Sequence, residues 1–228
     1  MTSSYFDYGS CRIIFGPMFA GKTSKLCAEL TECADIGLSC LYINHSFDER
    51  ETEYTSDDAT SHSSQFKGLS RKIMSCKIDY LGRLMPYSET NPYGYKDGHG
   101  YLTKSQKFID LDRYDVIGID EGQFFPDLVI NVRDWVLKKN KRVIIASLDG
   151  NYEMQPIGHA HELICICDPG AVKKLGARCK RCMIVEKPQR HFRLVDAGFT
   201  MKTKQGNGQE IEVGGSDLYE AVCMKCHQ

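Results

Sequence analysis

Short apolar runs alternate with amphipathic segments over the first three quarters of the chain. After the first run, Leu26, Leu30 and Cys33 recur at the spacing of a helix, and Gly37 is a typical residue to end it. The apolar runs themselves have the composition of buried parallel strands. They span residues 11–15, 38–44, 115–120 and 141–148. Strands that alternate with helices in this order predict an α/β fold with a mainly parallel sheet.

The pattern is weaker in two other parts of the chain. Residues 45–107 are largely polar, and their segment NPYGYKDGHGY is rich in Gly, Pro and Tyr, which predicts an exposed loop. The tail from 171 to 228 contains the basic segment KKLGARCKRC and a predicted β-hairpin through KQGNGQ. The change of character near residue 171 predicts a domain boundary there.

The segment GPMFAGKT follows the first predicted strand and fits the pattern G-x-x-x-x-G-K-[ST]. Backbone N–H groups in such a turn, together with a helix N-terminus, bind phosphate groups. We expect Lys22 to reach the β- and γ-phosphates of a nucleotide and the Thr23 hydroxyl to bind Mg²⁺. A chance glycine-rich turn is the alternative, but the strand before it and the helix after it favour the phosphate loop. The predicted phosphate-binding residues are Gly16, Pro17, Met18, Phe19, Ala20, Gly21, Lys22 and Thr23.

Acidic residues follow two of the predicted strands. In DEGQFF, Asp120 stands where phosphate-loop proteins hold the metal-binding acid, and Glu121 is a candidate general base for a hydroxyl that attacks a phosphoryl group. In FDER, Arg50 could neutralise charge on a transferring phosphoryl group, or pair with Asp48 in an exposed ion pair of little energetic weight. The sequence leaves both interpretations of FDER open.

Four of the eleven cysteines form two C-x-x-C pairs in the tail. Four thiolates in this arrangement suit a structural, tetrahedral Zn²⁺ site without an open position. Buried free thiols and a redox pair are the alternatives, and His227 is an alternative ligand to Cys226. The predicted zinc ligands are Cys179, Cys182, Cys223 and Cys226.

The composition narrows the classes of function. Hydrophobic residues make up 42% of the chain, and 29 Lys and Arg stand against 30 Asp and Glu. This balance argues against a protein that binds the nucleic-acid backbone. The segment MTSSYFDYGS lacks the regions of a secretion signal, and no run reaches the roughly 18 apolar residues of a spanning helix. We therefore expect a cytoplasmic protein with no nucleic-acid and no membrane partner.

Four segments together resemble a known family. GPMFAGKTSKL, DEGQFFPDL, ASLDGNY and EVGGSDLYEAVCMKC, in this order, are similar to the cytosolic (type II) thymidine kinases, and the resemblance spans residues 10–226. It implies a RecA-like P-loop domain over 10–170 and a small zinc-binding domain over 171–228, whose lasso loop covers the nucleoside. It also implies transfer of phosphate from ATP to thymidine with Mg²⁺, feedback inhibition by thymidine triphosphate, and a homotetramer.

The resemblance also assigns roles to individual residues. Glu121 would be the base on the nucleoside 5′-hydroxyl, Asp120 the acid on the Mg²⁺ side, and Arg50 would lie near the 5′-hydroxyl. Asp48 would assist on the metal side, and Gln123 would belong to the nucleotide-binding residues. The residues implied to contact the nucleoside are Met18, Phe124, Leu148, Tyr152, Thr200, Glu212, Val213, Gly214, Gly215 and Tyr219.

Three features depart from the family pattern. Extra residues around 82–104 have no counterpart, the interval between Cys182 and Cys223 is long, and Ile157 stands where an aromatic is common. A RecA-like ATPase that binds nucleic acid through KKLGARCKRC is the alternative enzyme. A regulatory protein without catalysis is disfavoured, because Lys22 and Glu121 are both present.

Overall fold

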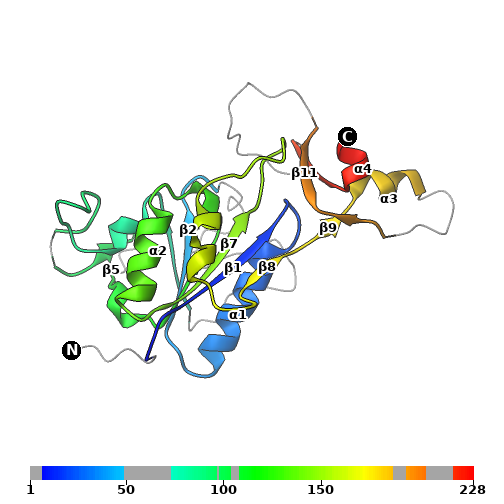
Figure 1. Ribbon diagram of the computed structural model, residues 1–228. Coiled ribbons are helices and arrows are strands. Elements are labelled where there is room, and N and C mark those ends of the chain that lie inside the picture. The colour runs from blue at the N-terminus through cyan, green and yellow to red at the C-terminus, as the bar shows by residue number, and fades with distance from the viewer. Residues whose placement is uncertain (1–6, 49–72, 97, 104–107, 187–193, 204–217) are drawn as a thin grey trace.

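The central element is a parallel β-sheet with helices on both faces, which confirms the predicted α/β class (Figure 1). The computed structural model describes residues 7–48, 73–96, 98–103, 108–186, 194–203 and 218–228. Among these residues, six strands form the sheet in the order β3-β2-β6-β7-β1-β8. They are β1 (Ser10–Gly16), β2 (Cys40–His45), β3 (Ile73–Ile78), β6 (Val116–Ile119), β7 (Arg142–Leu148) and β8 (Val172–Lys174).

Helices cover the two faces of this sheet because its strands are apolar on both sides. On β1, Ile13 packs into the core beneath α2 (Leu128–Leu137), and the next residue, Ile14, packs into the core beneath α1 (Lys22–Asp35). This alternation follows from the two-residue period of a strand. Trp135 of α2 and Leu26 of α1 are fully buried in the two cores. The sheet is therefore held from both sides.

The residues around 82–104 form a surface excursion at the β3 edge of the sheet. It begins with the 3-10 turn η2 (Leu81–Leu84) and includes the short strands β4 (Tyr101–Leu102) and β5 (Phe108–Ile109), which pair antiparallel. About half of its described residues are exposed, in agreement with the loop that its Gly- and Tyr-rich composition predicted. The rings of Tyr80 and Tyr93 stack with centroids 4.0 Å apart. The excursion thus has its own ordered contacts.

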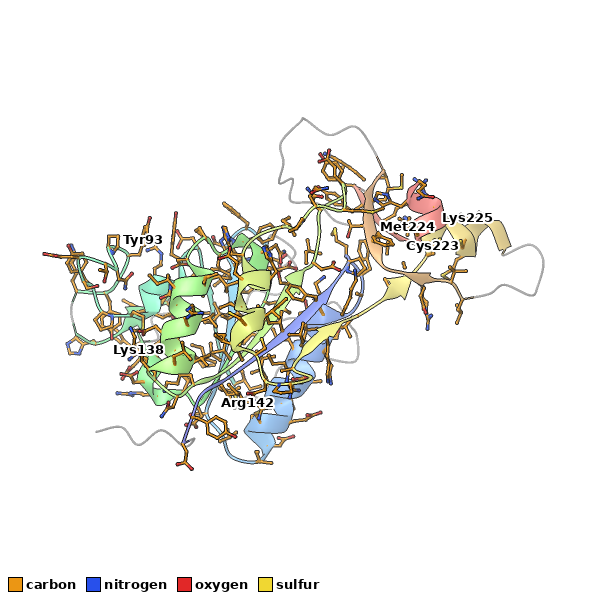
Figure 2. All side chains as sticks on the ribbon, in the orientation of Figure 1. Tyr93, Lys138, Arg142, Cys223, Met224 and Lys225 are labelled. Atoms are coloured by element: carbon orange, nitrogen blue, oxygen red, sulfur yellow. The ribbon has the colours of Figure 1, made fainter. Side chains whose placement is uncertain are left out.

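The tail forms a small module at the opposite edge of the sheet, beyond β8 (Figure 1). Two antiparallel pairs build it, β9 with β10 and β11 with β12, and the turn KQGNGQ that was predicted between the last two lies outside the described residues. In Figure 2, Tyr93 of the excursion and Cys223 of this module lie at opposite ends of the molecule. The elements are β9 (Ala177–Arg178), α3 (Lys180–Glu186), β10 (Asp196–Ala197), β11 (Phe199–Lys202), β12 (Tyr219–Val222) and α4 (Met224–His227).

The tail also contributes a strand to the large sheet. β8 pairs with β1 although it follows residue 171. The division into domains at 170/171 stays a prediction. In the part of the chain that the structure describes, no helix has the length and apolar character needed to cross a membrane.

Candidate active site

The predicted site residues follow the carboxyl ends of four strands of the sheet. β1, β2, β6 and β7 are parallel, so their carboxyl ends lie at the same edge. The phosphate loop follows β1, the Asp48 segment follows β2, DEGQFF follows β6, and Leu148 ends β7. The carboxyl edge of an open parallel sheet is where such folds bind ligands.

The phosphate loop turns sharply between β1 and α1. Gly16 and Gly21 have φ values of 157° and 79°, and Phe19 has a φ of 64°. A Cβ on Gly16 would lie 2.7 Å from the Leu175 carbonyl oxygen, so the chain passes too closely for a side chain there. α1 begins at Lys22, whose Nζ donates to the Pro17 carbonyl at 2.9 Å across the loop. The loop is therefore a closed turn at a helix N-terminus, the geometry that binds phosphate.

Asp120 is a buried carboxylate with its orientation fixed by two donors. Asp120 is only 2% exposed. Its carboxylate accepts hydrogen bonds from the Tyr42 hydroxyl at 2.8 Å and from the Glu121 backbone N–H at 3.0 Å. Burial is the main cause that raises the pKa of Tyr42 well above its usual value, and the charge of Asp120 raises it further. The phenol therefore stays protonated and donates to Asp120.

Glu121 is oriented by the side chain of Gln123. The Gln123 Nε2 donates to Glu121 Oε2 at 2.6 Å, while its Oε1 accepts from the Leu148 N–H at 2.9 Å and from the Ser147 hydroxyl at 3.2 Å. Leu148 is the register partner of Gly16 in the β1–β7 pair. One amide thus connects the candidate base to the strand end that faces the start of the phosphate loop.

The segment after β2 holds a third acidic residue of the predicted site. Asp48 is 7% exposed and accepts from Asn44 Nδ2 at 3.1 Å, while Lys77 of β3 donates to its backbone carbonyl. These contacts bind the Asp48 turn to two neighbouring strands. Arg50, the predicted partner of the phosphoryl group, lies outside the described residues.

A cavity of about 320 Å³ opens beside Gln123 and Phe124. Phe47, Pro126, Asn151, Pro156, Ile157, Gly158 and His159 form the rest of its wall. Of the residues predicted to contact the nucleoside, Phe124 lines this cavity. The sequence assigned no role to Phe47, the first residue of FDER, or to His45, which lies two residues before it.

The other predicted nucleoside residues that are described lie toward the tail module. The Met18 backbone N–H donates to Thr200 Oγ1 at 3.0 Å, which joins the phosphate loop to β11. Lys202 Nζ lies 5.2 Å from the centre of the Tyr152 ring, and Tyr219, on β12, is 8% exposed. Leu148 is partly buried at the end of β7. Glu212, Val213, Gly214 and Gly215 lie outside the described residues.

The four cysteines of the two C-x-x-C pairs converge at one point. Their sulfur atoms all lie within 4.8 Å of one another, and the Cys182 sulfur is 3.5 Å from that of Cys226 and 3.8 Å from that of Cys223. Tetrahedral zinc with Zn–S bonds of about 2.3 Å places sulfur atoms about 3.8 Å apart, so the donor set fits this metal. His227 instead directs its Nε2 to the Tyr152 carbonyl oxygen at 3.0 Å, which leaves Cys226 as the fourth ligand.

The zinc-type cluster is packed against the phosphate loop. Cys179 is fully buried in a small core with Ala197 and Val222, and Ala20 of the phosphate loop packs against the same core. Together with the Met18–Thr200 hydrogen bond, this contact ties the tail module to the nucleotide side of the site.

Comparison with known proteins agrees with this geometry. A family model described as thymidine kinase matches residues 9–82 and 91–227. The chain belongs to the thymidine kinase family. It is 31% identical over 224 residues to a thymidine kinase of Choristoneura fumiferana entomopoxvirus, with 96% of each chain covered. It is 29% identical to the thymidine kinase of Vaccinia virus (strain Western Reserve), over 96% of this chain and 97% of the other. Thymidine kinase 1 of Dictyostelium discoideum is 30% identical, over 96% of this chain and 78% of its own length.

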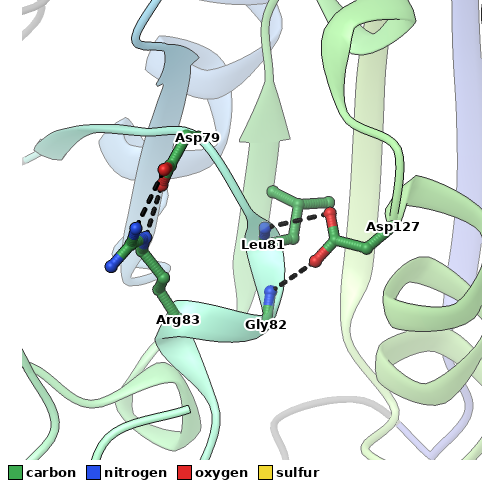
Figure 3. Close-up of polar contacts among 5 residues, drawn as sticks. All are labelled: Asp79, Leu81, Gly82, Arg83 and Asp127. Atoms are coloured by element: carbon green, nitrogen blue, oxygen red, sulfur yellow. Dashed lines mark hydrogen bonds and ion pairs between the residues drawn. The ribbon is translucent and has the colours of Figure 1, made fainter. Parts of the chain in front are cut away.

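The family match is interrupted at residues 83–90, inside the predicted extra segment of 82–104. The structure shows how the chain enters this segment (Figure 3). Arg83 pairs with Asp79 through two hydrogen bonds, and the Asp127 carboxylate accepts from the backbone N–H groups of Leu81 and Gly82 at 3.1 and 2.8 Å. Asp127 directly follows DEGQFFP, so the excursion starts in contact with the loop that carries Glu121.

Proposed function

We propose that this chain is an ATP-dependent thymidine kinase, which transfers the γ-phosphoryl group of ATP to the 5′-hydroxyl of thymidine and yields thymidine monophosphate and ADP. Membership of the thymidine kinase family supports a kinase. The observation that carries the proposal is the link from Glu121 through Gln123 to Leu148, the register partner of Gly16. This link supports the proposal, because phosphoryl transfer to a hydroxyl requires a carboxylate near the bound phosphates.

In this proposal Glu121 takes the proton of the 5′-hydroxyl as that oxygen attacks the γ-phosphorus. The new O–P bond forms while the bond from the γ-phosphorus to the bridging oxygen breaks, and the electron pair leaves with ADP. Gln123 orients this carboxylate by donating to its Oε2. Arg50 is proposed to neutralise charge on the transferring group.

The nucleotide side rests on the phosphate loop and two oxygen ligands. Residues 16–23 would surround the phosphates, with Lys22 on the β- and γ-groups and Gln123 and Asp48 nearby. Thr23 at the start of α1 and the buried Asp120 carboxylate offer the hard oxygen ligands that Mg²⁺ prefers. When bound, Mg²⁺ would neutralise charge on the β- and γ-phosphate oxygens.

The nucleoside would lie between the β6 and β7 ends and the tail module. Phe124, Leu148, Met18, Tyr152, Thr200 and Tyr219 are the proposed contacts among the described residues, together with the lasso residues 212–215. The zinc site would have a structural role, because four cysteine ligands leave no open coordination position. The two-domain division, the homotetramer, the feedback inhibitor thymidine triphosphate and the cytoplasmic location stay predictions.

An assay of ADP release across the natural nucleosides tests the proposal. The purified protein with ATP and Mg²⁺ should release ADP in the presence of thymidine, and thymidine-independent release alone would contradict it. Glu121→Gln should lower kcat by at least about a hundredfold, because general-base catalysis contributes roughly 10²–10⁴. Glu32→Gln, an exposed glutamate on α1, is the matched control and should keep the parental rate.

A further inference from the structure

An aromatic side chain from the end of β2 forms part of the wall of the cavity beside Phe124. Phe47 lines this cavity, and 57% of its surface is exposed, which is unusual for a phenylalanine. Its ring centre lies 6.4 Å from that of Phe124, and the two ring planes meet at 77°. The two edge-to-face rings line the cavity together with Pro156 and Ile157, so part of its wall is apolar. A flat, uncharged ring can pack against such a wall.

The Phe47 backbone forms a hydrogen bond with the side chain of a buried histidine. His45 is 2% exposed, and its Nδ1 accepts from the Phe47 backbone N–H at 3.1 Å. Its ring centre lies 4.7 Å from those of both Phe47 and Phe125 and 5.6 Å from that of Phe124. The His45 ring also lies near the backbone of Asp79, at the entrance of the surface excursion. One imidazole therefore contacts the turn after β2, the DEGQFF loop and the segment before η2.

We propose that Phe47 contacts the pyrimidine ring of the nucleoside, and that His45 is the positioning residue that holds Phe47 against the cavity. This inference rests on the proposed thymidine kinase activity and adds two residues to its site. The Nδ1 acceptor fixes where the Phe47 backbone lies, and the imidazole ring fills the space behind Phe47 and Phe124. Phe47 then offers an aromatic surface to the base, while Gln123 in the same wall orients Glu121.

Phe47→Ala tests the contact residue. Removing one aromatic wall should raise KM and Kd for thymidine roughly tenfold, since an aromatic contact and its buried area are lost. KM for ATP should stay unchanged, because the phosphate loop is formed by other elements. Phe108→Ala is the matched control: this phenylalanine is 51% exposed and lies on β5, outside the cavity wall. Its KM for thymidine should equal that of the parent.

Two variants of His45 test the positioning role separately from packing. His45→Phe keeps a ring but removes the acceptor, and it should raise KM for thymidine several-fold with little change in kcat. His45→Asn places Oδ1 where Nδ1 lies and keeps the acceptor, so its KM should be closer to that of the parent. Thermal unfolding and KM for ATP show whether each variant is folded. A His45→Phe variant with the parental KM for thymidine would overturn the positioning role.

The results separate this inference from the proposed function. A parent protein without thymidine-dependent ADP release would contradict the proposed function itself. An active parent whose Phe47→Ala variant binds thymidine with unchanged Kd would overturn the contact role of Phe47 and leave the kinase proposal standing. Loss of thymidine affinity in Phe47→Ala but not in Phe108→Ala would support the inference.

Discussion

Glu121 has a backbone conformation that few residues other than glycine adopt. Its φ and ψ are 52° and 44°, in the left-handed region, which costs a non-glycine residue on the order of 1 kcal/mol. The next residue, Gly122, has no room for a side chain, because a Cβ would lie 2.7 Å from Cγ2 of Ile145. The strained turn and the glycine together allow Gln123 to reach back to the Glu121 carboxylate. Strain of this kind is common at functional sites.

Residue types and spacing predicted the chemical groups of the site but not these contacts. The carboxylates of DEGQFF and the four cysteines were identified because few other patterns place such groups together. The bridge that Gln123 makes to Leu148 depends on the β1–β7 register, which no local pattern contains. His45 and Phe47 were missed because a histidine at the end of a strand and a phenylalanine two residues later have no distinctive spacing.

Lys141 allows a prediction on the pH dependence of stability. It is 6% exposed, its Nζ donates to the Asp112 carbonyl at 3.1 Å, and burial is the main cause that lowers its pKa below 10.5. Between the folded pKa and 10.5, the unfolded chain binds more protons than the folded one, so stability from this group rises with pH. Below the folded pKa the full penalty of burying the charge is present.

Lys141→Met removes this dependence. The free energy of unfolding of the parent, relative to the variant, should therefore increase from pH 7 toward pH 10.5. Urea denaturation followed through the fluorescence of Trp135 measures it at several pH values. Lys138→Met, which alters a lysine whose side chain is 77% exposed, should show no such trend. A difference between parent and Lys141→Met that does not change with pH would contradict the prediction.

At the scale of elements, the strongly apolar segments were predicted well. β1, β2, β6 and β7 lie within a few residues of the predicted ranges, because each is buried along most of its length. α1 ends at Asp35, two residues before the predicted end at Gly37. β3 was missed. It lies at an edge of the described sheet, and its sequence IMSCKI includes Ser75 and Lys77 among apolar residues. An edge strand has fewer neighbours to bury it, so its composition resembles that of a loop.

The contact between Asp127 and the excursion yields a prediction about an element. Asp127→Ala would leave the N–H groups of Leu81 and Gly82 without their acceptor, and Asn131 would also lose a partner. Each unsatisfied, partly buried group costs about 1–3 kcal/mol, so the free energy of unfolding should fall by about 2 kcal/mol or more. Asp127→Asn keeps one carbonyl oxygen and should lose less.

Chemical denaturation of these variants provides the measurement. Asp134→Ala is the control on the same helix, because its ion pair with Lys138 is at the surface and should change stability by less than about 0.5 kcal/mol. If Asp127→Ala were as stable as Asp134→Ala, the carboxylate would not hold the excursion in place.

At the scale of the molecule, the described chain has a large apolar core and a small tail module whose four cysteines suit a structural metal. The two apolar cores of the sheet contain most of the buried side chains, whereas the module around Cys179 buries only a few small residues. Structural zinc in small modules contributes about 10–16 kcal/mol of apparent folding free energy. We therefore expect the order of the module to depend on its four thiolates, and with it the Met18–Thr200 hydrogen bond and the contact with Ala20.

Removal of one cysteine of the cluster should therefore affect the tail module and leave the large core folded. Cys182→Ser should reduce bound zinc, measured by atomic absorption, and raise Kd for thymidine by more than about tenfold, because Thr200 and the Tyr152 contacts lose their support. The core around Trp135 should keep its native fluorescence, since Trp135 and the cysteines belong to separate apolar cores. Cys165→Ser, at an exposed cysteine outside the cluster, should change none of these quantities.

A Cys182→Ser protein that binds thymidine as tightly as the parent would show that the module is not needed for the nucleoside. A protein whose Trp135 fluorescence also became that of the unfolded chain would show that the large core depends on the metal as well.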